Sequence, residues 1–212
     1  DRSLLRHVQV VLSAAANPTT ARVATLRFHT ADVDLERVQV EGPADIGLQL
    51  VRNEAELRGC TFSGGIDQLQ AVHARTTITE GDFLQAGDDA WTVLVGGLKA
   101  ADVRIGGVVG VGIKAVTGAR VELMDCEVSG NGTALEAEEA AFIHMKNGLL
   151  DAPRAAHAGK AGVRHGAAAI ELQSVRTGTQ NNTFKSGKGS RIRIRKDGSE
   201  VGGAATAQNT AE

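Results

Sequence analysis

The feature that most constrains this chain is a ten-residue pattern that recurs along most of its length. Residues 121–130 read VELMDCEVSG, a run in which apolar and polar residues largely alternate before a closing glycine. Similar runs return about every 20 to 25 residues, which is the length of one turn in a solenoid protein. The clearest copies begin at Val33, Ala55, Thr76, Ala101 and Val121, and poorer copies begin near Ser3 and Thr177.

Alternation by twos within each run indicates a strand, whereas helical periodicity is absent. Each run continues through a Gly-rich turn into a second alternating segment, as at residues 47–50 and 92–95. Short strands with one apolar face cannot bury that face alone, but coils stacked about 4.8 Å apart can. We therefore expect an all-β, single-stranded parallel β-helix of about seven to eight coils over residues 1–198.

Composition agrees with a narrow solenoid interior and excludes some functions. The chain has 26 glycines among 212 residues, 3% aromatics and no tyrosine, and we expect most glycines at corners that need positive φ. A net charge of −2 and the lack of stacking aromatics make nucleic-acid binding unexpected. No apolar run is long enough to span a membrane, and no signal peptide is expected at the start of the chain.

The repeat resembles the right-handed parallel β-helix of the pectate-lyase-like superfamily, in its short-repeat form with a tight turn between the second and third strands. The resemblance covers roughly residues 3–198 and implies a right-handed winding. In that superfamily an interior column at the tight turn often holds asparagine. Here the column is expected to contain Val38, Cys60, Gly81, Gly106, Cys126 and Asn182. The superfamily includes lyases, hydrolases, epimerases, tailspikes and non-catalytic modules, so this fold does not by itself define an activity.

The two cysteines fall in this column three coils apart, which places them roughly 14 Å from each other. A disulfide requires Cα atoms within about 7 Å. We therefore expect Cys60 and Cys126 to be buried, reduced thiols with a structural role. Reduced thiols favour an intracellular compartment, although the sequence leaves the location open.

An acidic ladder is the strongest functional signal in the sequence. Asp45, Asp67 and Asp88 each stand five residues after the inner residue of a third strand, and Asp89 follows directly. Carboxylates stacked about 5 Å apart can share a proton or bind calcium. The alternative is a set of solvated corner residues that bond to their own backbone.

Residues 87–89 also resemble the Gly-Asp-Asp motif of polygalacturonase-like hydrolases, which implies that Asp67, Asp88 and Asp89 supply the acid and the base. Where those enzymes have Gly-His-Gly one coil later, residues 110–112 read GVG. Calcium held by Asp45, Asp67 and Asp88 is the one cofactor considered, because no pair of the six histidines has the spacing of a zinc site.

Two segments depart from the regular repeat. Residues 147–168 are predicted to contain an inserted loop, which is either a solvated excursion or a lip for a partner or ligand. A last strand is predicted at residues 191–196, followed by a disordered tail at 199–212. Its outward cations form a basic patch with two lysines before it: Lys185, Lys188, Arg191, Arg193, Arg195 and Lys196. This patch either discourages end-to-end stacking of solenoids or binds an anionic partner.

Three classes of function are compatible with the sequence. The first choice is a non-catalytic β-helix binding or scaffold module, part of a larger protein, with a polysaccharide or protein partner. The alternative is a lyase or hydrolase that acts on an acidic polysaccharide through Asp67, Asp88 and Asp89. The third is a stalk or tailspike-like segment that forms a homo-oligomer.

Overall fold

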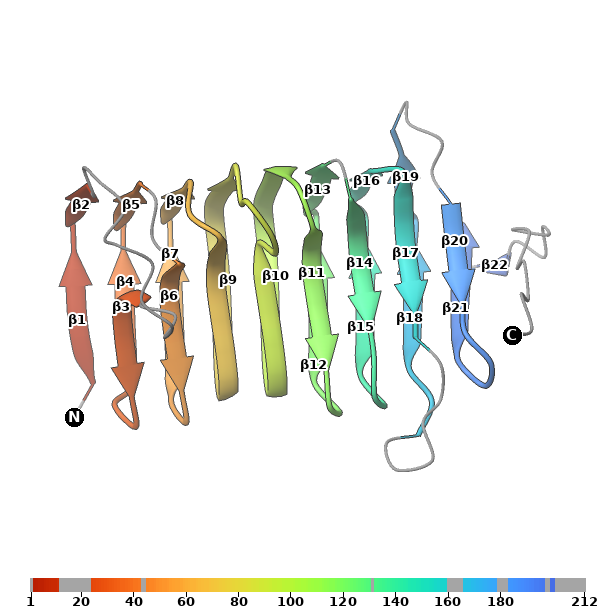
Figure 1. Ribbon diagram of the computed structural model, residues 1–212, viewed down its shortest axis with the longest axis horizontal. Helices are drawn as coiled ribbons and strands as arrows, with labels where there is room; N and C mark the ends of the chain where they lie inside the picture. The colour runs from red at the N-terminus through yellow and green to blue at the C-terminus, as the bar shows by residue number, and fades with distance from the viewer. Residues whose placement is uncertain are drawn as a thin grey trace.

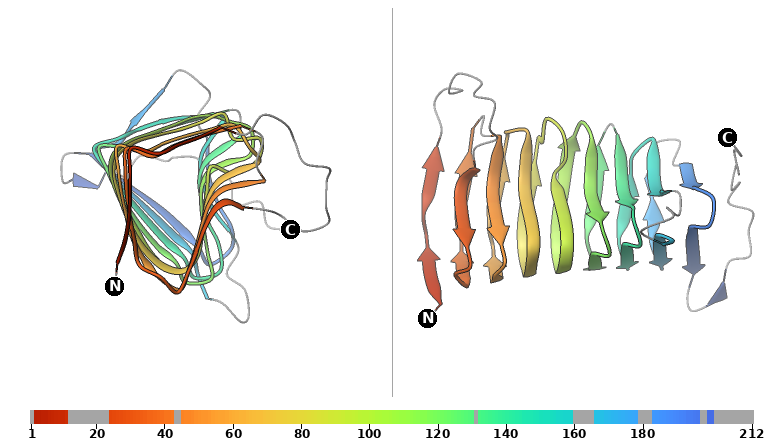
Figure 2. Two further views of the ribbon diagram at one scale, coloured as in Figure 1. Left: turned by 90° about the vertical axis from the view of Figure 1, so that its left-hand side faces the viewer. Right: turned by 60° about the horizontal axis from the view of Figure 1, so that its bottom comes forward.

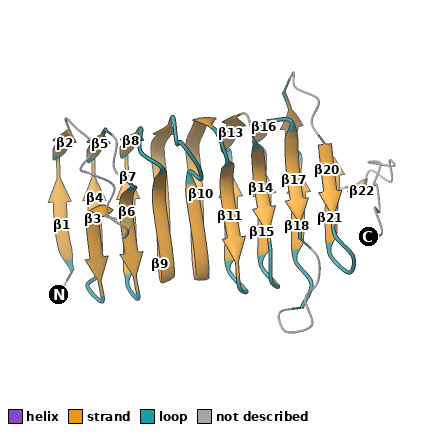
Figure 3. Ribbon diagram, viewed as in Figure 1, coloured by secondary structure: helices purple, strands orange, loops and turns teal. Residues whose placement is uncertain are grey.

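The fold is a stack of coils along one axis, running from the N-terminal to the C-terminal end of the chain (Figure 1). The computed structural model describes residues 2–11, 24–42, 45–130, 132–159, 166–178, 183–196 and 199–200. In these ranges the chain forms strands and loops, and none of them contains a helix that could cross a membrane (Figure 3). Successive coils pair in parallel, so the predicted all-β parallel solenoid is confirmed, with about 7 turns.

Each turn passes through three strand ladders, which we call face 1, face 2 and face 3 in chain order (Figure 2). Face 1 contains β3 (Ala24–His29), β6 (Ile46–Val51), the first parts of β9 (Asp67–Leu84) and β10 (Trp91–Val108), β11 (Val111–Val116), β14 (Thr133–Ala137), β17 (Arg154–Ala158) and β20 (Thr183–Ser186).

The other two faces are built in the same way. Face 2 contains β1 (Ser3–Arg6), β4 (Val33–Glu36), β7 (Glu54–Arg58), the middle parts of β9 and β10, β12 (Arg120–Met124), β15 (Phe142–Lys146), β18 (Ala169–Gln173) and β21 (Arg191–Lys196). Face 3 contains β2 (Gln9–Val11), β5 (Gln39–Glu41), β8 (Thr61–Ser63), the last parts of β9 and β10, β13 (Glu127–Gly130), β16 (Leu149–Asp151) and β19 (Arg176–Thr177). The short β22 (Ser199–Glu200) pairs antiparallel with β21.

The core consists of side-chain rows that run along the axis, one residue per coil. On face 1 such a row contains Leu26, Leu48, Leu69, Trp91, Ile113, Leu135, Ala156 and Phe184. The few aromatic residues reinforce it. Phe62 and Phe83 stack with ring centroids 5.1 Å apart, and Phe83 meets Trp91 edge to face at 4.9 Å.

The register differs from the sequence prediction in one coil. On face 2, Thr76 pairs with Leu98, and Leu98 pairs with Val121, so Leu98 holds the inward position that was predicted for Ala101. Alternation could not find this slip, because Ala100 and Ala101 are equally small and either could point inward.

The slip also changes the interior column that contains the two cysteines. The residue between Gly81 and the Cys126 coil is Val103 rather than Gly106. Gly148 and Val175 follow Cys126 at the same corner, and Asn182, which was predicted there, lies outside the described residues.

The insertion predicted over residues 147–168 is shorter than expected. Strands β16 and β17 lie inside this range and pair with β13 and β14 of the preceding coil. The regular coil therefore continues through Ala158, and only residues 160–165 of the predicted insertion lie outside the described ranges.

The predicted strand at 191–196 is confirmed as β21, and its Ile192 and Ile194 pack against the core. It is not the last strand, because β22 falls within the tail that was predicted to be disordered. Residues 201–212 of that tail lie outside the described ranges.

Two corners of each turn use a left-handed backbone, mostly without glycine. Between faces 2 and 3 one residue per coil has φ between 51° and 59°: His7, Arg37, Gly59, Glu80, Asp102, Asp125, Asn147 and Ser174. Between faces 1 and 2 the equivalent residues are Thr30, Arg52, His73, Val95, Thr117 and Glu139. A left-handed non-glycine residue costs about 1–2 kcal/mol, which the strand pairing on either side must offset. Most glycines were expected at corners with positive φ; nine described glycines have positive φ, but among the corner residues named here only Gly59 is a glycine.

Candidate functional site

The predicted acidic ladder lies at the corner that leads into face 1, but it forms two columns instead of one. The register places Asp67 opposite Asp89, whereas Asp45 and Asp88 fall one residue earlier in a neighbouring column. Asp45, Asp67 and Asp88 are therefore not one stack of calcium ligands. In the part of the chain that the structure describes, no group of three His, Cys, Asp or Glu side chains could hold a metal ion.

Two of the predicted catalytic carboxylates bond to the backbone of the next coil. The Asp89 N–H donates to Asp67 Oδ1 (3.3 Å), and the Val111 N–H donates to Asp89 Oδ1 (3.0 Å). The Thr92 hydroxyl also donates to Asp89 Oδ2 (3.5 Å). Asp67 is only 3% exposed, whereas Asp88 is exposed. Asp67 and Asp89 thus connect the corners of successive coils through hydrogen bonds.

Burial raises the pKa of the Asp89 carboxyl above its ordinary value. The Val111 N–H and the Lys114 ammonium lower this pKa, and the charges of Asp88 and Asp67 raise it, with a raised pKa as the net result. The charged form of Asp89 is therefore less favoured in the folded chain than that of an ordinary aspartate.

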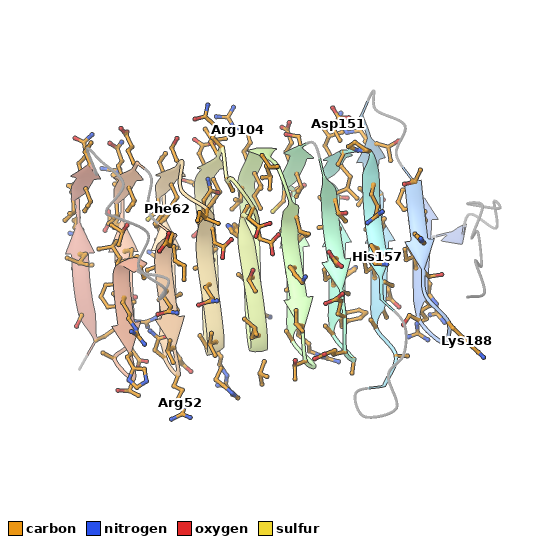
Figure 4. All side chains as sticks on the ribbon, viewed as in Figure 1. Arg52, Phe62, Arg104, Asp151, His157 and Lys188 are labelled. Carbon is orange, nitrogen blue, oxygen red and sulfur yellow. The ribbon has the colours of Figure 1, made fainter. Side chains whose placement is uncertain are left out.

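The predicted basic patch is divided between two faces. Lys185 lies on β20 of face 1, and Arg191, Arg193 and Arg195 lie on β21 of face 2. Lys188 is exposed in the turn between β20 and β21; Figure 4 labels this residue. Arg193 is 3.7 Å from Glu171 of the preceding coil, so part of the charge is already paired. The structure describes no side chain for Lys196.

A polar cluster that the sequence did not predict lies on the outer side of face 1. An outward row along this face contains Arg27, Gln49, Gln70, Thr92, Lys114, Glu136, His157 and Lys185. Within it, His157 Nδ1 lies 3.2 Å from Glu136 Oε1, and Lys114 Nζ lies 3.8 Å from Glu138 Oε2. Figure 4 shows His157 on this side of the solenoid, over β17. We call Lys114, Glu136, Glu138 and His157 the face-1 cluster.

The two carboxyl groups of the face-1 cluster have pKa values shifted in opposite directions. The hydrogen bond from His157 lowers the pKa of Glu136, and the Lys114 charge lowers it further against the effect of burial. Burial raises the pKa of Glu138, and the neighbouring Glu136 charge adds to this increase against the effect of Lys114. One carboxyl with a lowered pKa beside one with a raised pKa is an arrangement suited to acid–base chemistry.

A second acidic region forms a groove of about 500 Å³ at the corner between faces 2 and 3. Its carboxylates come from three successive coils: Glu80, Asp82, Asp102, Asp125 and Glu127. Arg104, labelled at this corner in Figure 4, donates from Nε to Asp82 Oδ1 (2.9 Å). Glu80, Asp102 and Asp125 are left-handed corner residues, and this backbone conformation places their side chains above one another. The spacing of acidic residues in the sequence did not predict this groove.

Both cysteines are free and buried, as predicted. Each Sγ lies near backbone carbonyl oxygens: Cys60 is 3.4 Å from Leu35 O, and Cys126 is 3.3 Å from Met124 O. Burial raises the pKa of both thiols, so neither has the character of a catalytic thiolate.

The signal for the face-1 cluster was present in the sequence but required the correct register. Lys114 and Glu136 could be placed on outward positions, whereas His157 was assigned to an inserted loop that is in fact strand β17. Comparison with known proteins does not add a family to these observations: no protein-family model, curated protein or solved structure was found to match this chain.

Proposed function

We propose that this chain is a non-catalytic binding or scaffold module of a larger protein, which presents the flat outer sides of its faces to a partner. The main support is the use of Asp67 and Asp89. Their carboxylates accept backbone N–H groups of the next coil, and Asp67 is almost fully buried. Carboxylates held in this way stabilise the solenoid, and this role accounts for them without catalysis.

The outer side of face 2 supports the same proposal. Ion pairs connect neighbouring coils there, including Arg2–Asp34 at 2.7 Å, Arg6–Glu36 at 2.6 Å and Lys99–Glu122 at 3.1 Å. Such exposed pairs contribute only about 0–1 kcal/mol each, but they make the outer side of face 2 polar. A surface of this kind is suited to recognition rather than to enclosing a reacting group.

We further propose that the solenoid is right-handed and related to the pectate-lyase-like superfamily. Parallel strands joined through a crossover are overwhelmingly right-handed. Three ladders per turn, with a left-handed corner residue between the second and third, agree with the short-repeat form of that fold. A crystal structure with a left-handed winding would refute this part of the proposal.

Incubation with polygalacturonate and with alginate tests the non-catalytic role. We expect neither new reducing ends nor unsaturated products, from the unaltered chain or from the Asp88→Asn and Asp89→Asn variants. Products that disappear in both variants would overturn the proposal and establish these aspartates as catalytic.

A second candidate, a polysaccharide lyase or hydrolase, is favoured by the face-1 cluster. The raised pKa of Glu138 suits the role of the acid, and the hydrogen bond from His157 lowers the pKa of Glu136 beside it. This candidate uses carboxyls other than the aspartates implied by the Gly-Asp-Asp resemblance.

The Glu138→Gln variant tests the second candidate. If this cluster is catalytic, the substitution should lower turnover about 10²- to 10⁴-fold, and activity should decrease as the pH rises above the raised pKa of Glu138. Glu122→Gln, which alters an exposed carboxylate on face 2, is the matched control and should leave turnover unchanged. Equal activity of the Glu138→Gln variant and the unaltered chain would exclude the cluster.

A further inference from the structure

The outer side of face 2 contains two adjoining hollows along strand β10. The first is centred on Gly97 and the second on Ala101, each has a volume of about 430 Å³, and both are lined by Lys99 and Glu122. At both hollows β10 carries a small outward residue: Gly97 lies between Arg75 and Arg120, and Ala101 lies between Thr79 and Met124. A Cβ atom added to Gly97 would lie 3.8 Å from Arg120 O, an ordinary van der Waals contact, so a further side-chain atom fits here without a clash.

The spacing of the hollows matches an extended peptide. Gly97, Lys99 and Ala101 are alternate residues of one strand, so their outward positions are about 6.6 Å apart in succession. A second extended chain lying over β10 would present its own alternate side chains at the same interval. Its first and third such side chains would enter the hollows, and its second would face Lys99.

Charge complementarity identifies the side chains that fit. The lining of the first hollow contains the cations Arg75, Lys99 and Arg120 and the carboxylate of Glu122. Arg75 is paired with Glu54 (3.3 Å) and Lys99 with Glu122 (3.1 Å), but the Lys99 side chain is 71% exposed and the cations outnumber the carboxylate. Arg120 forms no ion pair with any residue that the structure describes, and its guanidinium lies 5.8 Å from the centre of the Phe142 ring. Acidic side chains are therefore favoured in the first hollow and opposite Lys99.

The second hollow has a different character. Its lining includes Ala101, Leu123 and the side chain of Met124, which is one of the large apolar residues left exposed at 49%. Methionine adapts its shape to apolar partners and is common on peptide-binding surfaces. An apolar side chain is therefore favoured at the third position.

We propose that the groove over β10 binds an extended peptide segment of a partner protein, with acidic, acidic and apolar side chains at three alternate positions. This inference rests on the proposed non-catalytic function and specifies the partner. A peptide fits better than a sugar chain because the hollows lie at strand spacing, and because the His144 ring in the lining of the second hollow already faces the Phe142 ring, with centroids 6.5 Å apart. The backbone of β10 is already paired on both sides, so recognition depends on side chains.

Fluorescence anisotropy with a labelled synthetic peptide tests the proposal. The probe carries Glu-Thr-Glu-Thr-Leu flanked by threonines, and the matched peptide carries lysine in place of both glutamates. We expect saturable binding of the first peptide only. Lys99→Ala should weaken it about fivefold, the effect of losing one exposed charge pair, and salt should weaken it as well.

Two further variants test the groove: one occupies the second hollow, and the other is a control outside the groove. Ala101→Leu should abolish binding by occupying the second hollow, while thermal unfolding shows that the variant is folded. Arg6→Ala, which removes a paired cation on β1 of face 2, should bind like the unaltered chain. Equal binding by all variants, or equally good displacement of the peptide by polygalacturonate, would overturn the proposal. Polysaccharide turnover without loss of peptide binding would overturn only the non-catalytic function.

Discussion

Asp89→Asn is expected to stabilise the chain at neutral pH, although an aspartate in a Gly-Asp-Asp sequence would ordinarily be treated as catalytic. The raised pKa of Asp89 means that its folded form favours the proton. The stability that Asp89 contributes is therefore present below the ordinary pKa of 3.8 and is lost as the pH rises through the folded-state pKa. Asparagine keeps an oxygen that can accept the Val111 N–H and removes the charge that burial disfavours.

The matched variant Asp89→Ala separates the charge from the hydrogen bonds. It removes the acceptor for the Val111 N–H at 3.0 Å and for the Thr92 hydroxyl at 3.5 Å. Loss of a partner for a part-buried backbone donor costs about 1–3 kcal/mol. For a domain of this size each kcal/mol lowers the midpoint temperature by about 2–4 °C.

The measurement is thermal unfolding followed by far-ultraviolet circular dichroism at about pH 7 and about pH 3.5. We expect Asp89→Asn to melt above the unaltered chain at the higher pH, with the difference disappearing at the lower pH. Asp89→Ala should melt below the unaltered chain at both. The reasoning is refuted if Asp89→Asn is as unstable as Asp89→Ala at neutral pH, because the charge itself would then be needed.

Three further predictions follow from the backbone and the core. Val95→Asn should raise the unfolding free energy by about 1 kcal/mol, because Val95 has a φ of 52° that a β-branched residue adopts poorly; an unchanged urea midpoint would contradict this. Gly112→Ala should lower the unfolding free energy by about 1–3 kcal/mol, because its Cβ would lie 2.7 Å from Ala134 O, whereas Gly97→Ala should be neutral by the same urea titration. Both cysteine thiols should resist a colorimetric thiol reagent in the native chain and react fully in urea; fast native labelling would show that they are not buried.

The sequence predicted the solenoid because alternation is a local property. The strand at residues 191–196 was predicted with its bounds, since isoleucines and arginines alternate there without ambiguity. The prediction that Ala101 points inward at the start of its coil was wrong, because small residues occur on both sides of that strand. Only the pairing with Thr76 and Val121 shows that Leu98 holds this position.

The candidate sites were harder to predict because they depend on register between coils. A shift of one residue separates Asp88 from Asp67 and places Asp89 opposite it instead. His157 meets Glu136 across 21 residues of chain, and this contact follows only if both lie on paired strands. The hollows over β10 depend on side chains of the neighbouring coils, such as Arg75, Arg120 and Met124, and the sequence of β10 alone does not predict them.

The stacking of coils also fixes the distances between surface positions in whole steps. Since every turn advances the chain by the same step of about 4.8 Å, the distance between two surface positions on one face equals the number of intervening turns multiplied by that step. Duplication of one turn would move the cationic end of face 2 away from β10 by one further step, while each coil would still contact only its two neighbours. Evolution could thus adjust the separation of two bound partners in whole increments.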